Sequence, residues 1–491
     1  MKQLIFVITF FIFIYSSFAQ NVGINADGSQ PNGRAMLDIK STDKGVMFPR
    51  MTSAQRLAIP VTNGDGGLMV FDTDKQCLYI YTGMNWRAMP FATEKEIYPV
   101  NYSVSDAEDF DQFGSTVAID GDYAAIGAPG DDEGGISNQG SVYIFRFNNG
   151  SWTQHQKISI NNLHANARFG SSVAMSNDLL VVGAPSEDVN GQGSHGAVYV
   201  FRLMNNQWSQ HAKLLPNEVV SMNDPFNFGR SVAVSNNRIL VGAPGKDNGS
   251  YTNQGAAYLF LHNGSNWFQN NKFIHGEATG SDFFGHSVAI DANRIVIGAP
   301  DKRVNNISQA GAAYVFYSAN GTTGWNMEQK IVNLTQAFED HFGSTVAIEG
   351  DKILAAAPGA VIGSSDFAGS VGIFVYDTSV NSFTIRRVLS ITDHKDEDYF
   401  GQSIAMKGEK ILVGAPFRDS EGLFNSGSVW FYERTNPIGS WDYKRTILDA
   451  DIESINFFGA AVAICRQTGR YIIGSYYAND AKGRVSFGTL E

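Results

Sequence analysis

Carboxylates gather in the loops that follow a recurring Gly-Ala-Pro motif, and they are the side chains of this chain best suited to chemistry. Closely spaced carboxylates bind divalent cations or cationic ligands. Asp and Asn also stabilise turns on their own, because their side chains accept hydrogen bonds from nearby backbone N–H groups. For any single residue the turn function is the expected one, whereas the loops together form a candidate ligand-binding surface. The candidate ligand-binding residues are Asp131, Asp132, Glu133, Glu187, Asp188, Asp247, Asp301 and Asp419.

Motifs for catalysis or for a transition metal are missing from the sequence. The nine histidines are scattered without a His-x-x-x-His pair, and there are only two cysteines. Neither a Gly-x-Ser-x-Gly elbow nor a phosphate-binding loop occurs. We therefore expect no enzyme, no catalytic residue and no metal or other cofactor. A carboxylate pair for glycoside hydrolysis, brought together from distant loops, stays open as an alternative.

Composition limits the class of partner. The chain has 491 residues and a formal net charge of −12, which argues against nucleic acid and anionic membranes as partners. It contains 51 Gly, 34 Phe and 19 Tyr but only 17% charged residues, a balance that suits short strands joined by tight turns.

The first twenty residues have the pattern of an export signal. Lys2 precedes an apolar run from Leu4 to Tyr15, and small residues at Ser17 and Ala19 predict cleavage after Ala19. The run is shorter than the roughly 20 residues that span a bilayer. We expect residues 1–19 to be removed and the mature protein, without a transmembrane segment, to be secreted or held at the cell surface.

An internal repeat of about 58 residues must position the candidate loops. A Phe-Gly pair recurs at intervals of 56, 59, 56, 58, 58 and 58 residues, beginning at Phe113, Phe169, Phe228, Phe284, Phe342, Phe400 and Phe458. Gly-Ala-Pro starts fourteen residues after the Phe in five repeats; Ala356-Ala357-Pro358 replaces it in the fifth, and Gly474-Ser475 lies two residues later in the seventh. A second glycine follows thirteen residues further on in six repeats, at Gly140, Gly196, Gly255, Gly311, Gly369 and Gly427.

Each repeat contains four strand patterns. The first follows Phe-Gly, the second ends at Gly-Ala-Pro, the third is rich in Tyr and Phe, and the fourth begins near an aromatic residue. Asn-Gly pairs such as Asn149-Gly150 predict tight hairpins between the third and fourth strands. We expect the tryptophans of the fourth strand to pack between repeats rather than to stack on sugars; they are Trp152, Trp208, Trp267, Trp325 and Trp441.

The predicted fold class is all-β: a seven-bladed β-propeller of four-stranded antiparallel blades, preceded by a small β-rich N-terminal module. Closure of the ring covers faces and edges that a single meander leaves exposed. The seventh repeat has only three strand patterns, whereas residues 96–104 have a strand pattern without a partner. We predict that 96–104 closes the seventh blade, so that the propeller covers 96–491. The loops from strand two to strand three, and from strand four to strand one of the next blade, lie on the same face of the propeller. We expect most of the loop carboxylates on that face.

The spacing of Phe-Gly and Gly-Ala-Pro resembles the FG-GAP repeat family, which includes the propeller at the head of integrin α chains and many bacterial secreted proteins. The resemblance covers residues 97–491 and implies a seven-bladed propeller that takes part in adhesion or ligand recognition. Several integrin repeats carry a calcium loop between strands one and two. Here those hairpins, such as Asp120-Gly121-Asp122, are too short to supply five or more oxygen ligands. Calcium is therefore not expected there, and only the face loops stay open to it.

Residues 20–95 differ in character from the repeats. A short helix is predicted around Thr52 to Leu57, and a hairpin joins 67–71 with 77–81. The segment resembles leader modules of secreted bacterial surface proteins. With about 75 residues it has a thin core, so we expect it to pack on the propeller or to self-associate with its copies. Cys77 and Cys465 either pair or remain buried thiols, and their spacing fits both.

The leading functional hypothesis is a secreted or cell-surface binding or adhesion protein that recognises an extracellular protein or glycan through loops on one propeller face. Two alternatives stay open: an extracellular carbohydrate-active enzyme and a structural unit of a surface filament. The near-equal repeats argue against the enzyme, because a catalytic centre usually enlarges the loops of one blade.

Overall fold

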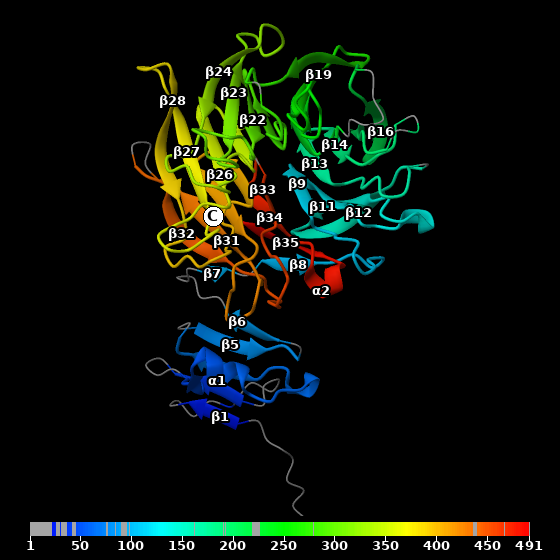
Figure 1. Cartoon of the computed structure of the whole chain (residues 1–491). Coiled ribbons are helices and arrows are strands. Elements are labelled where there is room, and N and C mark those ends of the chain that lie inside the picture. The colour runs from blue at the N-terminus through cyan, green and yellow to red at the C-terminus, as the bar shows by residue number, and fades with distance from the viewer. Residues whose placement is uncertain are drawn as a thin grey trace, which may run out of the picture.

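The computed structural model of the chain describes residues 22–25, 30, 37–41, 46–74, 77–83, 85–89, 96–97, 99–161, 163–189, 191, 193–218, 226–277, 279–435, 439–465 and 467–490. The predicted export signal at 1–19 lies outside these residues. Within them the chain forms a ring of seven β-sheets and a smaller module at the rim of the ring (Figure 1). None of the described helices is long and apolar enough to cross a membrane.

The first four blades are antiparallel meanders in chain order. Blade 1 contains β9 (Thr116–Asp120), β10 (Tyr123–Ala128), β11 (Ser141–Asn148) and β12 (Ser151–Ile158). Blade 2 contains β13 (Ser172–Ser176), β14 (Leu179–Ala184), β15 (Ala197–Met204) and β16 (Gln207–Leu214). Blade 3 contains β17 (Ser231–Ser235), β18 (Arg238–Ala243), β19 (Ala256–His262) and β20 (Trp267–Phe273). Blade 4 contains β21 (Ser287–Asp291), β22 (Arg294–Ala299), β23 (Ala312–Tyr317) and β24 (Asn326–Ile331).

The last three blades continue the order. Blade 5 contains β25 (Val346–Glu349), β26 (Lys352–Ala357), β27 (Ser370–Asp377) and β28 (Ser382–Leu389). Blade 6 contains β29 (Ser403–Lys407), β30 (Lys410–Ala415), β31 (Ser428–Glu433) and β32 (Asp442–Ile447). Blade 7 contains β33 (Ala461–Ile464), β34 (Arg470–Ser475) and β35 (Arg484–Thr489) from the last repeat. Short helical turns η2 (Glu133–Gly135) and α2 (Ala478–Ala481) lie in loops.

The seventh blade takes its outer strand from ahead of the first repeat. β8 (Val100–Tyr102) pairs antiparallel with β35, with Tyr102 opposite Val485. The segment 96–104 is nevertheless divided, because β7 (Glu96–Ile97) pairs parallel with β32 as a fifth strand of blade 6. Pro99 lies between β7 and β8 and has no N–H to continue a ladder, which accounts for the break. The single closing strand predicted for 96–104 is therefore two short strands on two blades.

The Phe of each Phe-Gly pair joins its blade to the preceding one. Its backbone N–H donates to the carbonyl oxygen just before the glycine that leads into the preceding third strand, as from Phe169 to Gln139 (2.9 Å). The same bond from Phe113 to Lys482 (3.1 Å) joins blade 1 to blade 7 and closes the ring. All seven Phe side chains are at most 1% exposed, so each one also fills the contact between two blades.

Two further backbone hydrogen bonds account for the constant spacings. The N–H of the Phe-Gly glycine donates to the carbonyl of the first Gly-Ala-Pro residue in every repeat, from Gly170 to Gly183 (3.0 Å) and even from Gly459 to Gly474 (3.1 Å). The N–H of the next glycine donates back across its loop, as from Gly196 to Glu187 (3.0 Å). The two extra residues of the seventh repeat lie in the longer connection between β33 and β34.

Hydroxyl groups reinforce six of the seven contacts between blades. The residue two positions after the Phe-Gly glycine is Ser or Thr in six repeats and donates to the Phe-Gly glycine of the next blade, as from Thr116 to Gly170 (2.7 Å) and from Ser287 to Gly343 (2.8 Å). The seventh repeat has Ala461 at this position. The contact between blades 7 and 1 therefore lacks this bond, and other contacts such as that of Phe113 hold the two blades together.

The outer-strand tryptophans lie between blades, as predicted. Trp208 is 2% exposed and belongs to the buried cluster that includes Ala125 and Ile144 of blade 1. Trp152 of blade 1 stacks on Phe487 of blade 7, with ring centroids 4.3 Å apart. Trp152, Trp208 and Trp441 are buried, which removes them from contact with a ligand, whereas Trp267 and Trp325 are partly buried.

The N-terminal module packs on the rim of the propeller. It contains β1 (Val22–Asn25) parallel to β2 (Leu37–Lys40), and a sheet of β3 (Arg50–Met51), β4 (Met69–Asp72), β5 (Cys77–Tyr81) and β6 (Trp86–Met89). The predicted helix and hairpin are confirmed as α1 (Ser53–Leu57) and the β4–β5 pair. The 3-10 turn η1 (Asn63–Asp65) lies between them in sequence.

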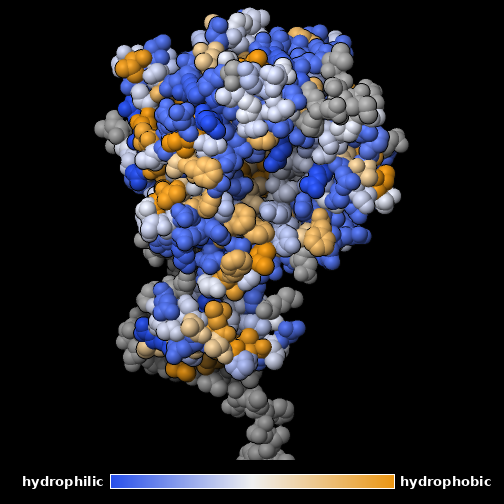
Figure 2. All heavy atoms as spheres, in the orientation of Figure 1, coloured by the Kyte–Doolittle hydropathy of each residue, from blue (hydrophilic) through white to orange (hydrophobic). Residues whose placement is uncertain are grey.

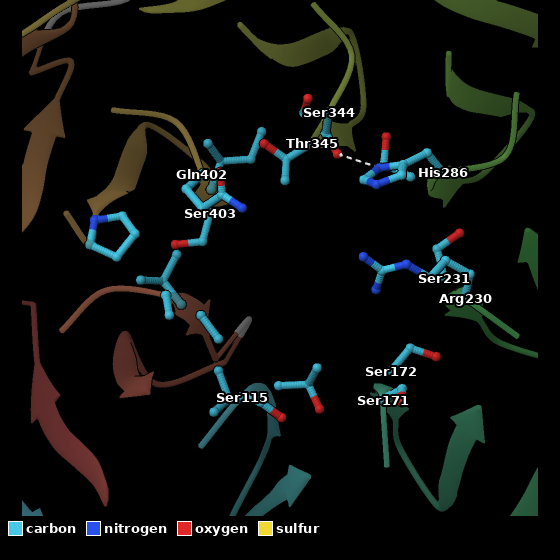
Figure 3. Close-up of a pocket in the computed structure, with 18 of the residues that line it drawn as sticks. Ser115, Ser171, Ser172, Arg230, Ser231, His286, Ser344, Thr345, Gln402 and Ser403 are labelled. Carbon is cyan, nitrogen blue, oxygen red and sulfur yellow. Dashed lines mark hydrogen bonds between the residues drawn. The ribbon is translucent and has the colours of Figure 1, made fainter. Parts of the chain in front are cut away.

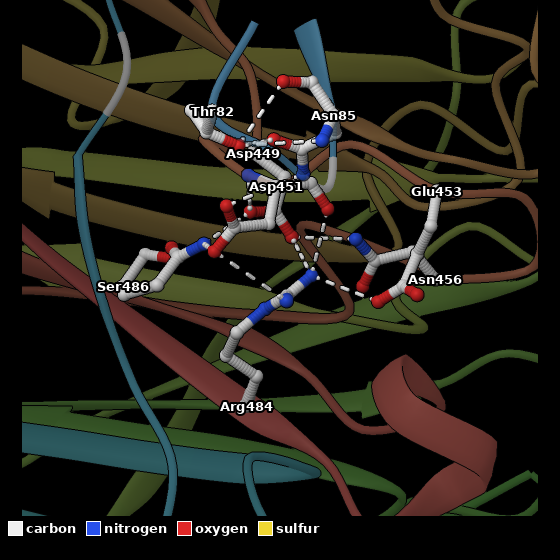
Figure 4. Close-up of polar contacts among 9 residues, drawn as sticks. Thr82, Asn85, Asp449, Asp451, Glu453, Asn456, Arg484 and Ser486 are labelled. Carbon is white, nitrogen blue, oxygen red and sulfur yellow. Dashed lines mark hydrogen bonds and ion pairs between the residues drawn. The ribbon is translucent and has the colours of Figure 1, made fainter. Parts of the chain in front are cut away.

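Polar contacts hold the module against loops of blades 6 and 7. The Tyr79 hydroxyl donates to Glu421 (2.5 Å), and the guanidinium of Arg56 lies 3.9 Å from the same carboxylate. Asn85 donates to Asp451 (3.4 Å), beside the buried ion pair of Arg484 and Asp449 (2.7 Å; Figure 4). Of the two cysteines, Cys465 is buried and free, while the side chain of Cys77 lies outside the described part of the structure.

Candidate functional site

The most buried of the predicted ligand-binding carboxylates are engaged inside their own blades. Asp131 is 6% exposed, accepts a hydrogen bond from Ser141 (2.5 Å) and pairs with Lys157 (2.9 Å). Glu187 is 3% exposed and pairs with Lys213 (3.4 Å). These contacts stabilise the blades, because a buried carboxylate needs a cationic or hydrogen-bonding partner.

Four blades repeat the same cluster of a third-strand Tyr, a fourth-strand Lys and a loop carboxylate. The Lys157 ammonium lies 5.1 Å from the centre of the Tyr143 ring, and Lys213 lies 5.2 Å from that of Tyr199. Burial raises the pKa of Tyr143 well above its usual range. The counterparts in blades 3 and 4 are Lys272 with Tyr258 and Lys330 with Tyr314.

Three of the predicted residues cap their own loops. Asp132, Asp247 and Asp419 each accept a hydrogen bond from the backbone N–H six residues further on, at 2.7, 2.7 and 2.9 Å. This arrangement satisfies loop donors and orders the connection between strands two and three.

The remaining three carboxylates have different surroundings. Glu133 joins Asp131 on Lys157 (2.8 Å), and Asp301 accepts a hydrogen bond from His341 (2.8 Å). Asp188 has one buried oxygen without a hydrogen-bond partner. Of the eight predicted residues, only Asp131 and Glu133 share a cation in the described structure. Within the described part of the chain, no three His, Cys, Asp or Glu residues are placed to hold a metal ion.

Acidic residues two positions before Phe-Gly also cap turns. Asp111, Asp340 and Asp398 accept hydrogen bonds from backbone N–H groups three residues earlier, at 2.7, 2.9 and 2.8 Å. Burial raises the pKa of Asp111 to about 6, and the nearby Asp131 carboxylate acts in the same direction.

The substitution Asp111→Asn is expected to stabilise the protein at pH 8 and to leave its stability unchanged at pH 4. Because the folded-state pKa of about 6 exceeds the usual aspartate value of 3.8, ionisation of Asp111 opposes folding. The wild type therefore loses this part of its stability as the pH rises from about 4 to 6. Asn retains an acceptor for the Glu108 N–H. Thermal melts at both pH values measure the effect, and a variant less stable than wild type at pH 8 would contradict it.

The loops between strands two and three and between consecutive blades lie on one face of the propeller. At the centre of that face is the mouth of the central channel. A cavity of about 800 Å³ lies there, lined by residues at the start of the first strand of every blade (Figure 3). Hydroxyl and amide side chains line much of it, including Ser115, Ser171, Ser344 and Gln402. Among the described residues that line the cavity there is neither Asp nor Glu. In a chain of net charge −12, this cavity is a local exception.

Cationic side chains occupy one part of the mouth. Arg168 and Arg230, at the starts of blades 2 and 3, are exposed to the cavity, and Arg230 points into it (Figure 3). Within the described chain neither guanidinium has an anionic partner. The cavity walls, which partly displace water around Arg230, and the like charge of Arg168 lower the pKa of Arg230. Burial, together with Arg230, lowers the pKa of His286 to about 4, so this ring is neutral at pH 7. The hydrogen bond with Asp301 raises the pKa of His341.

Aromatic side chains occupy the part of the mouth formed by blades 5 to 7. Phe367 stacks on Tyr399, with ring centroids 5.5 Å apart, and Tyr399 contacts Phe417 at 5.0 Å. Phe417 contacts Phe457 at 4.9 Å, and Phe457 stacks on Tyr476 at 5.5 Å. Every one of these five rings is half-buried. We call this set of five rings the aromatic row; Tyr399, Phe417 and Tyr476 line the cavity.

The residue before Phe-Gly has the same backbone conformation in all seven repeats. This residue has a left-handed conformation throughout, with φ of 56° at Arg168 and 48° at Tyr399. Non-glycine residues adopt this conformation at a cost of about 1–2 kcal/mol. The conformation is constant but the side chain changes from repeat to repeat: Gln112, Arg168, Asn227, Phe283, His341, Tyr399 and Phe457.

Arg168, Arg230 and the aromatic row were not among the residues predicted from the sequence. Their signal is the variation that appears when the seven repeats are aligned on Phe-Gly. The Phe-Gly and Gly-Ala-Pro positions have nearly the same residues in every repeat. The residue types directly before and after Phe-Gly, and just after Gly-Ala-Pro, differ between repeats.

The protein is therefore a β-propeller in which the residues that join the blades are repeated, whereas the residues that line the channel mouth differ from blade to blade. Five segments match the FG-GAP repeat family: residues 103–145, 152–201, 208–260, 267–316 and 386–432. The chain is an FG-GAP repeat protein, of a class of β-propellers frequent among extracellular binding proteins. The altered Gly-Ala-Pro positions of blades 5 and 7 fall outside the matched segments. Residues 23–99 match the family described as a phage tail like trimerisation region. No curated protein matches the chain.

Proposed function

We propose that this protein is a secreted or cell-surface binding protein that recognises an extracellular protein or glycan through the mouth of its central channel. The proposal rests on one observation: the residues that join the blades repeat, whereas the residues at the channel mouth do not. Every blade repeats the same backbone hydrogen bonds, yet Arg168, Arg230 and the aromatic row break the sevenfold pattern around one cavity. A concave site with a few converging polar groups is the usual form of a binding site.

Export is part of this proposal. The apolar run from Leu4 to Tyr15 and the small residues before Ala19 support cleavage after Ala19. The extracellular setting of many FG-GAP proteins supports the same location.

Filling the mouth of the channel is expected to abolish recognition. The double variant Ser115→Trp/Ser171→Trp places two indoles in the cavity, whereas Ser265→Trp places one in the hairpin between β19 and β20, on the opposite face. Glycan and extracellular-matrix protein arrays probed with the labelled full chain should give hits that the double variant loses and the control retains. Hits that survive in the double variant, with an unchanged melting temperature, would contradict the proposal.

We further propose that the N-terminal module joins several copies of the chain. Its match to a trimerisation region supports this, as do the apolar side chains that it exposes, which gather over the module in Figure 2. The exposed residues are Ile24, Leu37, Ile39, Val46, Met47, Leu57 and Leu68. Large apolar surfaces of this kind mark interaction sites. Light scattering should give three times the chain mass for the full protein and a single chain mass for residues 96–491; a monomeric full chain would contradict self-association.

Binding without turnover is the third part of the proposal. The described part of the cavity lining includes no carboxylate that could act as nucleophile or general acid, and His286 and His341 are held by hydrogen bonds with Ser344 and Asp301. Release of reducing ends from a polysaccharide panel by the full chain would contradict it.

A further inference from the structure

We propose that the channel mouth binds an anionic carbohydrate, a chain of sugar rings that carry carboxylate or sulfate groups. This inference rests on the proposed function and names the ligand class of the same cavity.

The charge of the cavity favours an anion. Arg168 lies close enough to Arg230 for its charge to lower the Arg230 pKa, and the described lining residues include no carboxylate that would neutralise the two guanidinium groups. A planar guanidinium donates two parallel hydrogen bonds to a carboxylate or sulfate. An anion between the two arginines would relieve their repulsion, whereas a neutral or cationic ligand would leave it in place.

The aromatic row favours a ligand with flat apolar faces. In a ring of seven blades, blades 6 and 7 lie opposite blade 3, where Arg230 stands. Tyr399, Phe417 and Tyr476 therefore face the cationic part across the cavity, and in Figure 3 Gln402 and Ser403 lie across from Arg230. Half-exposed rings offer apolar faces at small entropic cost, because their neighbours already order them. The C–H face of a sugar ring fits such a surface.

Hydroxyl and amide groups around the cavity favour a ligand rich in hydroxyls. Ser115, Ser344 and Gln402 line the cavity, and the Ser115 hydroxyl is buried without a hydrogen-bond partner in the described structure. A buried hydroxyl of this kind is costly unless a ligand or water satisfies it. A cavity of about 800 Å³ has room for several sugar rings.

The test measures affinities of the full chain by isothermal titration calorimetry. The ligands are a hexamer of galacturonic acid, its methyl ester, and a sulfated galactan hexamer. The variants are Arg168→Gln/Arg230→Gln and Phe417→Ala. The matched controls are Arg303→Gln and Phe424→Ala, exposed residues of the same loop face that do not line the cavity. Melting temperatures of all variants check folding.

We expect at least one anionic hexamer to bind, at least tenfold more tightly than the methyl ester, and to weaken with added salt. The arginine double variant and Phe417→Ala should each lose at least tenfold in affinity, with both controls unchanged. The two anionic hexamers distinguish carboxylate from sulfate.

Equal binding of the ester, or full affinity in the arginine double variant, would overturn the inference. So would preferential binding of an acidic aromatic peptide, or no binding of either anionic hexamer at millimolar concentration. If array hits then still depend on an open cavity, the proposed function stands and only the ligand class fails. If no array hit depends on the cavity, the proposed function fails as well.

Discussion

A chain that begins at Asp106 is expected to lose cooperative unfolding or to melt at least 10 °C below a chain that begins at Glu96. The shorter chain lacks β7 and β8, so β35 has an unpaired edge and blade 7 has three strands. It also loses the Tyr102 ring, which packs on Phe145 and Phe487, and the Val104 side chain, which belongs to the same buried cluster.

The polar contacts of β8 add to this loss. Asn101 donates to Asp449 (2.6 Å) and Asp451 (2.9 Å) and accepts from Ser486 (2.5 Å). Removing one partner of a buried polar group costs about 1–3 kcal/mol, and removing a large core side chain costs about 2–5 kcal/mol. Because domains are stable by only about 5–15 kcal/mol, the ring should open. Calorimetry compares the two chains, and coincident transitions would show that the ring closes without β8.

The second large effect is expected at the glycines between blades. Gly255→Ala should destabilise the protein by at least about 4 kcal/mol, a size reserved for severe packing or backbone conflicts. Gly255 has φ of +87°, and an added Cβ would lie well inside van der Waals contact of the Phe284 backbone in the next blade. The bond from Phe284 N–H to the Gln254 carbonyl would then break.

Gly264→Ala is the matched control for this substitution. Gly264 has φ of +99° but lies in the hairpin between β19 and β20 with open space around its Cα, so only the left-handed backbone opposes a side chain. Its cost should be about 1–2 kcal/mol. Urea unfolding of both variants separates crowding between blades from backbone conformation. Equal losses at the two positions would show that the crowding is unimportant.

The framework could be predicted because the same few residues make the same bonds in every blade. Gly170 and Gly183 are thirteen residues apart because the first donates a backbone hydrogen bond to the second, and Phe169 is apolar because it fills a contact between blades. Gly483, the counterpart of Gly255 in the seventh repeat, could not be found from a fixed spacing. The helical turn α2 shortens its loop, although its carbonyl neighbour Lys482 still accepts from Phe113.

The site was less predictable, for two physical reasons. Asp132, Asp247 and Asp419 are carboxylates and so resemble ligand-binding residues, but each accepts a hydrogen bond from a backbone N–H of its own loop. In all three loops the donor is an Asn six residues further on. Arg168, Arg230 and Tyr399 lie in different repeats and become neighbours of one cavity only when the ring closes.

The account is tested most directly by a crystal structure of the full chain grown with the galacturonic acid or sulfated galactan hexamer that binds it more tightly. We predict density for the sugar in the channel mouth, with an anionic group at Arg168 and Arg230 and a ring face against Tyr399 or Phe417. Density at the acidic loops or on the N-terminal module, with the channel mouth empty, would contradict it.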